Sequence, residues 1–291
     1  MEVKVNHLTP GMLLEKDVLG KSGNPIVEKN TKLTETHIEF IKHFLIDKVT
    51  VATSRIQSST SDNEQRFLSI HGNQLFIEEF EQAVFHYEKL FISWQNNVPV
   101  NMYKIREFCI PLFEKTIDQN METFLLLFAN SEQNSFFQNG IAKSIISVYL
   151  SYKLGFEKKD WLQIGLAALM SDCGKATLEP SVFKSKLPNS TWQKYPVFSY
   201  KMIENEPTLT QQAKIAILQH HEYLDGSGFP AKSKGHKVKM YARIIAVSNM
   251  FTTVYSTSPK EIISVLEDYR INKLDKLVVD TLVNELQGFI E

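Results

Sequence analysis

A long run of helical periodicity, from about residue 66 to the end of the sequence, most constrains what this chain can fold into. Large apolar residues recur at spacings of three and four on one helix face: Phe76, Phe80, Val84, Tyr87, Phe91 and Trp94. Apolar segments of the same kind predict further helices around 105–113, 121–129, 137–153, 159–171, 191–204, 208–221, 240–254, 259–267 and 275–289. We therefore predict a mainly α fold built as a helical bundle.

The N-terminal residues follow a different pattern. Short β-prone pieces alternate with turn residues such as Pro10-Gly11 and Gly23-Asn24-Pro25, and a single helix is predicted over 35–45. This indicates a small α+β module over residues 1–54. The Ser-rich polar stretch over 55–65 is predicted to be a linker, and the helical domain is predicted over 66–291.

Composition excludes several classes of protein. A formal net charge of −1 gives no sign of a nucleic-acid binder. The two cysteines, Cys109 and Cys173, are too few for a disulfide scaffold or a Cys-rich zinc module. The apolar runs fall far short of the ~20 residues of a membrane-spanning helix, and residues 1–12 do not resemble a signal peptide. We expect a cytoplasmic protein without a membrane span.

Two short segments carry recognisable chemistry. Adjacent histidines, His220 and His221, precede a Gly-rich turn that ends in Phe229-Pro230. On a helix, two neighbouring imidazoles project ~100° apart, so they can share one metal only where the helix ends or the ion sits between them. Asp172 and Lys175 follow an apolar helix. They could be a metal ligand and a phosphate-binding cation, or simply the polar end of a capped helix.

Together these segments resemble the HD-GYP family of helical, metal-dependent phosphohydrolases that cleave cyclic di-GMP. The His-Asp-x-Gly-Lys motif of the family corresponds to residues 171–175. Its His-His-Glu-x-x-Asp-Gly-x-Gly-Tyr-Pro signature corresponds to 220–230, with Phe229 in the tyrosine place and with Asp225, Gly226, Gly228 and Pro230 retained. A later helix motif corresponds to 242–249. The resemblance covers residues 66–291 and implies a helical HD-domain bundle preceded by the small N-terminal module.

The resemblance also implies two or three iron or manganese ions, held by His and Asp ligands. Three of those ligand positions are retained as Asp172, His220 and His221. The others carry Asn139, Ser171, Tyr195 and Asn249, and the family's later Asp-Arg-Pro-Tyr-Arg stretch is missing. Asn and Ser are weak neutral ligands for such ions. We therefore expect no resident cofactor, and alternatively a single Fe or Mn ion on the three retained ligands with Tyr195 beside them.

The lost ligands predict the loss of hydrolysis, because a bridging metal hydroxide would be the nucleophile. We therefore expect a non-catalytic HD-GYP-like protein in nucleotide second-messenger signalling, with no catalytic residues, or Lys175 if the site is active. It would act by binding a protein partner, for which the resemblance suggests a diguanylate cyclase domain contacting the loop 225–230. Cyclic di-GMP binding without hydrolysis, through Lys175 and Arg243, is a second hypothesis. The alternative is a metal-dependent phosphodiesterase acting on cyclic di-GMP or another phosphate ester through a residual metal site.

Overall fold

The computed structural model divides the chain into two compact units, Met1–Gln65 and Arg66–Glu291, which are described separately. In the helical part it describes residues 62–129, 136–179 and 192–287. Nearer the N-terminus it describes 2–9, 11–19, 25–27, 29, 31–34, 38, 41 and 48–51. Residues 55–61 of the predicted linker lie outside the described residues. A helix begins at Asp62, within the predicted linker.

The N-terminal unit is built on two antiparallel strand pairs. β1 (Glu2–Lys4) pairs with β4 (Lys48–Thr50), and β2 (Val18–Leu19) pairs with β3 (Pro25–Val27). The short helix η1 (Val5–His7) follows β1. Aliphatic side chains form the core of this unit, among them Leu14, Leu33 and Ile41. The helix predicted over 35–45 lies outside the described residues except at Ile38 and Ile41, which are both buried.

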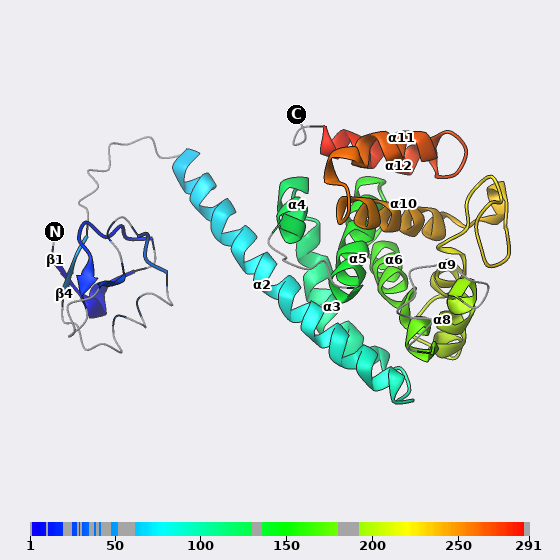
Figure 1. The fold of residues 1–291 in the computed structure, drawn as a ribbon, viewed down its shortest axis with the longest axis horizontal. Helices are drawn as coiled ribbons and strands as arrows, with labels where there is room; N and C mark the ends of the chain where they lie inside the picture. Colours follow the sequence, from blue (N-terminus) through cyan, green and yellow to red (C-terminus); the bar gives the residue numbers. More distant parts are fainter. Residues whose placement is uncertain are drawn as a thin grey trace. The chain divides into compact units, whose positions relative to one another are not determined.

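The second unit consists of helices joined by turns and loops, with no strand among its described residues (Figure 1). Its helices are α2 (Asp62–Gln95), α3 (Met102–Thr116), α4 (Met121–Ala129), α5 (Phe136–Lys153), α6 (Lys158–Met170), α8 (Tyr195–Ile203), α9 (Gln211–Gln219), α10 (Met240–Tyr255), α11 (Ile262–Arg270) and α12 (Lys276–Leu286). Single turns join them: η2 (Cys173–Thr177), η3 (Trp192–Lys194), η4 (Gly235–Lys237) and η5 (Pro259–Glu261). The mainly α prediction is confirmed, and the helix boundaries agree to within a few residues.

Helix α5 is the centre of this unit. Every residue from Gly140 to Ser151 is buried, because α5 packs against α6, α10, α3 and α12. In Figure 1, α5 and α6 lie side by side and α10 runs across them. A helix enclosed on all sides is expected to be apolar around its whole circumference. One charged residue, Lys143, interrupts the buried part of α5.

The turn that follows α6 packs tightly against α8. The backbone N–H of Gly174 in η2 donates to Ser199 Oγ at 2.8 Å, and Ser199 Oγ donates to the carbonyl of Ser171 at 2.7 Å. Residue 174 must be glycine for this approach, since a Cβ there would lie 2.3 Å from Ser199 N and 2.4 Å from Tyr195 O. Both are backbone atoms, which cannot move aside independently.

We expect Gly174→Ala to lower the free energy of unfolding by about 2–3 kcal/mol, because α8 must move away from η2. The measurement is urea denaturation followed by far-UV circular dichroism. The matched control is Gly155→Ala, where nothing lies within 4 Å of the added Cβ and only the positive φ of +81° is unfavourable. That control should lose about 1 kcal/mol. Equal losses in the two variants would contradict the close packing of η2 on α8.

Candidate functional site

Asp172 is the acidic residue on which the site is built. Helix α6 ends at Met170, Ser171 is its C-cap, and the chain then turns into η2, so the Asp172 side chain leaves the helix end and enters the domain interior. Asp172 is 7% exposed. A carboxylate buried to this degree needs charged or hydrogen-bonding partners, because removing it from water without them is costly.

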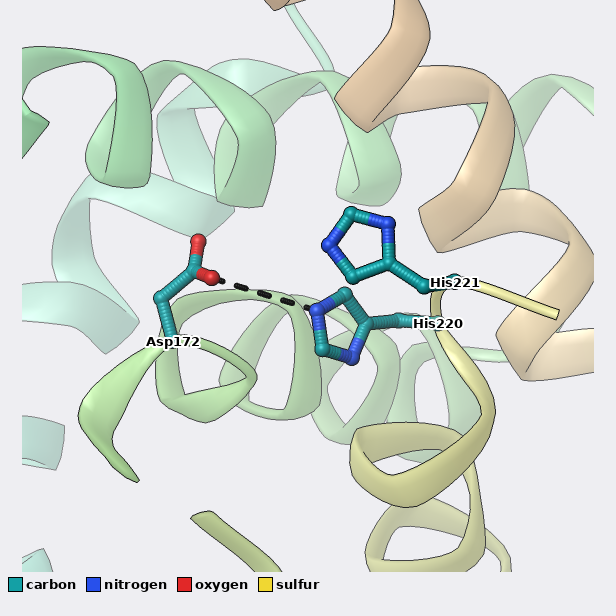
Figure 2. A group of neighbouring side chains, drawn as sticks. All are labelled: Asp172, His220 and His221. Atoms are coloured by element: carbon teal, nitrogen blue, oxygen red, sulfur yellow. Dashed lines mark ion pairs between the residues drawn. The ribbon is translucent and has the colours of Figure 1, made fainter. Parts of the chain in front are cut away.

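His220 and His221 reach the same region from the end of α9. The helix stops at Gln219 and His220 is its C-cap, so the two rings are not held at the angle of a continuing helix. Their centroids lie 4.3 Å apart. Figure 2 shows Asp172 facing both imidazoles, with Nε2 of His220 3.9 Å from Asp172 Oδ1. One ligand atom from each of these three residues lies within 4.8 Å of the others.

Tyr195, at the first position of α8, lies between the two histidines. Its hydroxyl is 3.0 Å from Nε2 of His220 and also contacts Nε2 of His221. Nδ1 of His220 lies 2.7 Å from the carbonyl of Ile217, which can only accept, so Nδ1 carries the proton and Nε2 is the acceptor. The Tyr195 hydroxyl then donates to His220, and Nε2–H of His221 donates to the Tyr195 oxygen. These bonds use both imidazole Nε2 atoms.

Lys143 is the residue that sequence reasoning missed. It is 1% exposed, and its Nζ donates to Ser171 Oγ at 2.7 Å and forms an ion pair with Asp172 Oδ2. A signal for it exists in the sequence. Lys143 is the one charged residue between 136 and 152, and it follows Asn139 by four residues, which places both on one helix face.

Lys175 supplies a second ammonium group. Its Nζ lies 2.8 Å from Asp172 Oδ1. It also lies over aromatic rings, 4.4 Å from the ring centre of Tyr195, 5.3 Å from that of Trp192 and 5.2 Å from that of Phe136. The predicted phosphate-binding cation is therefore already held by a carboxylate and by aromatic faces. Each carboxylate oxygen of Asp172 therefore forms an ion pair with a different lysine.

The charges of the site shift the pKa values of its members in one consistent pattern. Burial alone would raise the pKa of Asp172, but Lys143 and Lys175 reverse this effect and hold it well below the usual value. Burial and the two lysines lower the pKa of His220 to about 3, against the opposing effect of Asp172. Burial and the neighbouring His220 lower the pKa of His221 as well. Both imidazoles are therefore neutral at pH 7.

The remaining positions predicted from the resemblance have varied surroundings. Ser171 is buried; its Oγ accepts from Lys143 and donates to the carbonyl of Ala168 at 2.8 Å. The amide oxygen of Asn139 is buried and has no hydrogen-bond partner among the described residues. Asn249 is half-buried on α10.

Arg243 is fully engaged in a structural role. Its guanidinium contacts Asp275 Oδ2 at 3.0 Å and donates to the carbonyls of Val238 at 2.8 Å and Gly235 at 3.2 Å. These bonds tie the start of α10 to η4 and to the N-cap of α12. They account for the side chain without any phosphate.

The loop 225–230 folds back over His221. The ring of Phe229 stacks on the His221 imidazole, with centroids 4.5 Å apart and 20° between the planes. Asp225 Oδ1 accepts from the backbone N–H of Ser227 at 2.8 Å, and Gly226 has a positive φ of +83°. A Cβ at Gly228 would lie 2.3 Å from the carbonyl oxygen of His221. Pro230 follows Phe229 and lines an open, apolar groove of about 420 Å³ between α8 and α9.

These residues do not fit the metal centre that the resemblance implies. Any divalent ion within reach of Asp172 and the imidazoles would face the Lys143 ammonium across a buried, low-dielectric space, where like charges repel strongly. The histidine nitrogens that would bind it are bonded to Tyr195. Asn139, Ser171 and Asn249 offer only neutral oxygen or nitrogen atoms in place of His and Asp.

The HD domain family matches residues 127–276, which run from the end of α4 to the first residue of α12 and include the whole site. The chain therefore belongs to the HD domain family. A HDG"Y"P protein from Bdellovibrio bacteriovorus has the same fold, with a TM-score of 0.57 at 14% identity over 99% of both chains. The predicted resemblance to HD-GYP proteins is confirmed at the level of family and fold.

The similar curated proteins are phosphodiesterases of cyclic dinucleotides. The cyclic di-GMP phosphodiesterase response regulator RpfG of Xanthomonas campestris is 28% identical over 40% of this chain and 32% of its own length. The 3'3'-cGAMP-specific phosphodiesterase 1 of Vibrio cholerae is 24% identical over 62% and 46%. The cyclic di-GMP phosphodiesterase PdeB of Borreliella burgdorferi is 23% identical over 52% and 42%. The chain thus spans less than half the length of these relatives. Within the described residues, none of its helices has the length and apolar character that a bilayer crossing requires.

We expect Tyr195→Phe to lower the free energy of unfolding by about 1–3 kcal/mol, because it leaves buried imidazole nitrogens without partners. Chemical denaturation measures the change. The matched control is Tyr200→Phe on the same helix, whose hydroxyl has no hydrogen-bond partner among the described residues; this variant should be nearly neutral. A Tyr195→Phe protein as stable as the control would contradict the hydrogen-bond chain from Ile217 to His221.

Proposed function

We propose that this chain is a non-catalytic HD-domain protein of nucleotide second-messenger signalling, which acts by binding rather than by hydrolysis. One observation carries the proposal: the donor atoms of the three retained ligands are engaged by the protein's own groups. Lys143 and Lys175 pair with Asp172, and the Tyr195 hydroxyl bonds to both imidazoles. Hydrolysis by a metal-bound hydroxide would need these atoms to hold an ion instead.

The binding partner that the surface favours is another protein. Pro230 and Ala231, at the end of the Gly-rich loop, border the apolar groove together with Val197, Tyr200 and Leu218. The loop is held firmly, since the Glu222 carboxylate accepts from the backbone N–H groups of Ala231 at 2.6 Å and Ser233 at 3.0 Å. A preformed apolar groove of this kind binds a partner without a large ordering cost. A diguanylate cyclase domain is the partner class that the family resemblance suggests.

A second candidate function is the binding of a cyclic dinucleotide without hydrolysis. The observation that favours it is charge, because two lysines share one aspartate and leave the site with an excess positive charge. Aromatic rings stand beside that charge, with Trp192 5.1 Å from Tyr195 and 5.9 Å from Phe229 between ring centres. Calorimetry with cyclic di-GMP and 3'3'-cGAMP tests it. Binding that weakens sharply in Lys175→Ala supports this candidate, and no heat at high micromolar ligand contradicts it.

The alternative of a metal-dependent phosphodiesterase gives opposite results in one pair of measurements. We expect protein purified without oxygen and without chelating resin to carry far less than one Fe, Mn or Zn per chain by elemental mass spectrometry. We also expect no linear product from cyclic di-GMP or 3'3'-cGAMP with added Mn²⁺ or Fe²⁺. An active relative assayed in parallel is the positive control. Turnover that Asp172→Ala abolishes would overturn the proposal in favour of the phosphodiesterase.

A further inference from the structure

Lys143 lies in the part of the helical unit where a charge is most unfavourable. It is 1% exposed and lies within the buried stretch of α5, with Ile141, Ala142, Ile145 and Ile146 around it in sequence, each fully buried. A buried ammonium group is tolerated only if the interaction with its partner offsets the free-energy cost of removing it from water. The partner is Asp172, which is itself buried and lies at the end of a different helix.

The direction of the Lys143 side chain explains how it reaches that carboxylate. Side chains on an α-helix lean towards its N-terminus, so a long side chain lies over the turn before its own Cα. For Lys143 that turn contains Asn139, the position where the family resemblance puts the first metal ligand. Lys143 therefore approaches Asp172 from the helix face that would present that ligand. Its Nζ also donates to Ser171 Oγ at 2.7 Å, and Ser171 stands at the motif histidine position.

We propose that Lys143 takes the place of a metal ion in this domain: its ammonium is the internal cation that neutralises Asp172, joins α5 to the end of α6 and keeps divalent ions out. This inference rests on the proposed function in one respect, namely that the site works without a metal. The second lysine cannot substitute for Lys143, because Lys175 contacts the other carboxylate oxygen and approaches from η2, next to Asp172 in sequence. Only Lys143 links Asp172 to the central helix among the ion pairs of the described residues.

The first test is the stability of Lys143→Met, which removes the charge and keeps most of the volume. We expect its melting temperature to fall by about 5–15 °C, because Asp172 loses a buried partner. The matched control is Lys214→Met. Lys214 is also buried, at 9% exposure, but its Nζ donates to the carbonyl of Glu204 at 2.7 Å and pairs with no carboxylate of the described residues. Its melting temperature should fall clearly less.

A double-mutant cycle with Asp172→Asn then separates the ion pair from the loss of packing. If Lys143 serves to neutralise Asp172, the double variant Lys143→Met with Asp172→Asn should melt above Lys143→Met alone. Additive losses, with the double variant less stable than the wild type by the sum of the two single losses, would overturn the proposal. So would equal losses in Lys143→Met and Lys214→Met.

The second test is metal uptake, which a purely structural lysine would not affect. Lys143→Ala removes the ammonium and opens space beside Asp172, His220 and His221. We expect this variant to bind about one Mn²⁺ or Zn²⁺ per chain by equilibrium dialysis, because the three donors are an accepted ligand set for such ions. The wild type should bind none at the site, and the added substitution Asp172→Ala should abolish uptake. Equal uptake by the wild type, or none by Lys143→Ala, overturns the proposal.

These outcomes are independent of the hydrolysis assay. A wild-type protein without activity whose Lys143→Met variant is fully stable would leave the proposed function standing and refute the role of Lys143. A wild-type protein that hydrolyses a cyclic dinucleotide would refute the proposed function. If its Lys143→Ala variant then bound additional metal, the role of Lys143 would still be supported.

Discussion

The buried ion pair between Lys143 and Asp172 is the interaction on which the rest of the site depends. It joins the central helix α5 to the turn after α6, across 29 positions of sequence. Because both groups are away from water, each fixes the position of the other. Ser171 Oγ is a further partner of the Lys143 ammonium, and Lys175 is a further partner of the Asp172 carboxylate. Burial is the main cause that lowers the pKa of both histidines and keeps them neutral, and the two nearby ammonium groups act in the same direction.

The histidine pair shows how a ligand set can be retained and yet given another use. His220 and His221 keep the identity and place that the family resemblance assigns them. Their Nε2 atoms, which a metal would need, are within hydrogen-bond distance of the Tyr195 hydroxyl. Phe229 stacks on the ring of His221. The residues that hold the histidines in this state come from α8, α9 and the Gly-rich loop, so the arrangement is a property of the packed domain.

The sequence predicted the helical domain well because the signal for it is local. Apolar spacing such as that from Phe76 to Trp94 depends on one helix and one neighbouring core, and α2 buries all of these residues except the half-buried Val84. The structure brings together the segments at 172 and 220–221, which the family resemblance had singled out. The role of Lys143 could not be read in the same way. This role depends on a contact with Asp172, which in turn depends on how two helices pack. In the sequence of α5 alone, a lysine would be interpreted as a solvent-exposed residue. Arg243 is the reverse case: its partner Asp275 is distant in sequence, and the bonds to Asp275 and Gly235 give it a structural role.

The replacement of an ion by a lysine changes what the domain depends on in the cell. A bound iron or manganese ion must be captured, can be lost by exchange, and in the case of iron can change oxidation state. An ammonium group on a covalent side chain is made with the protein, in a fixed ratio of one to one, and has no redox chemistry. A domain built around Lys143 and Asp172 therefore reaches its folded state independently of metal supply and of oxygen.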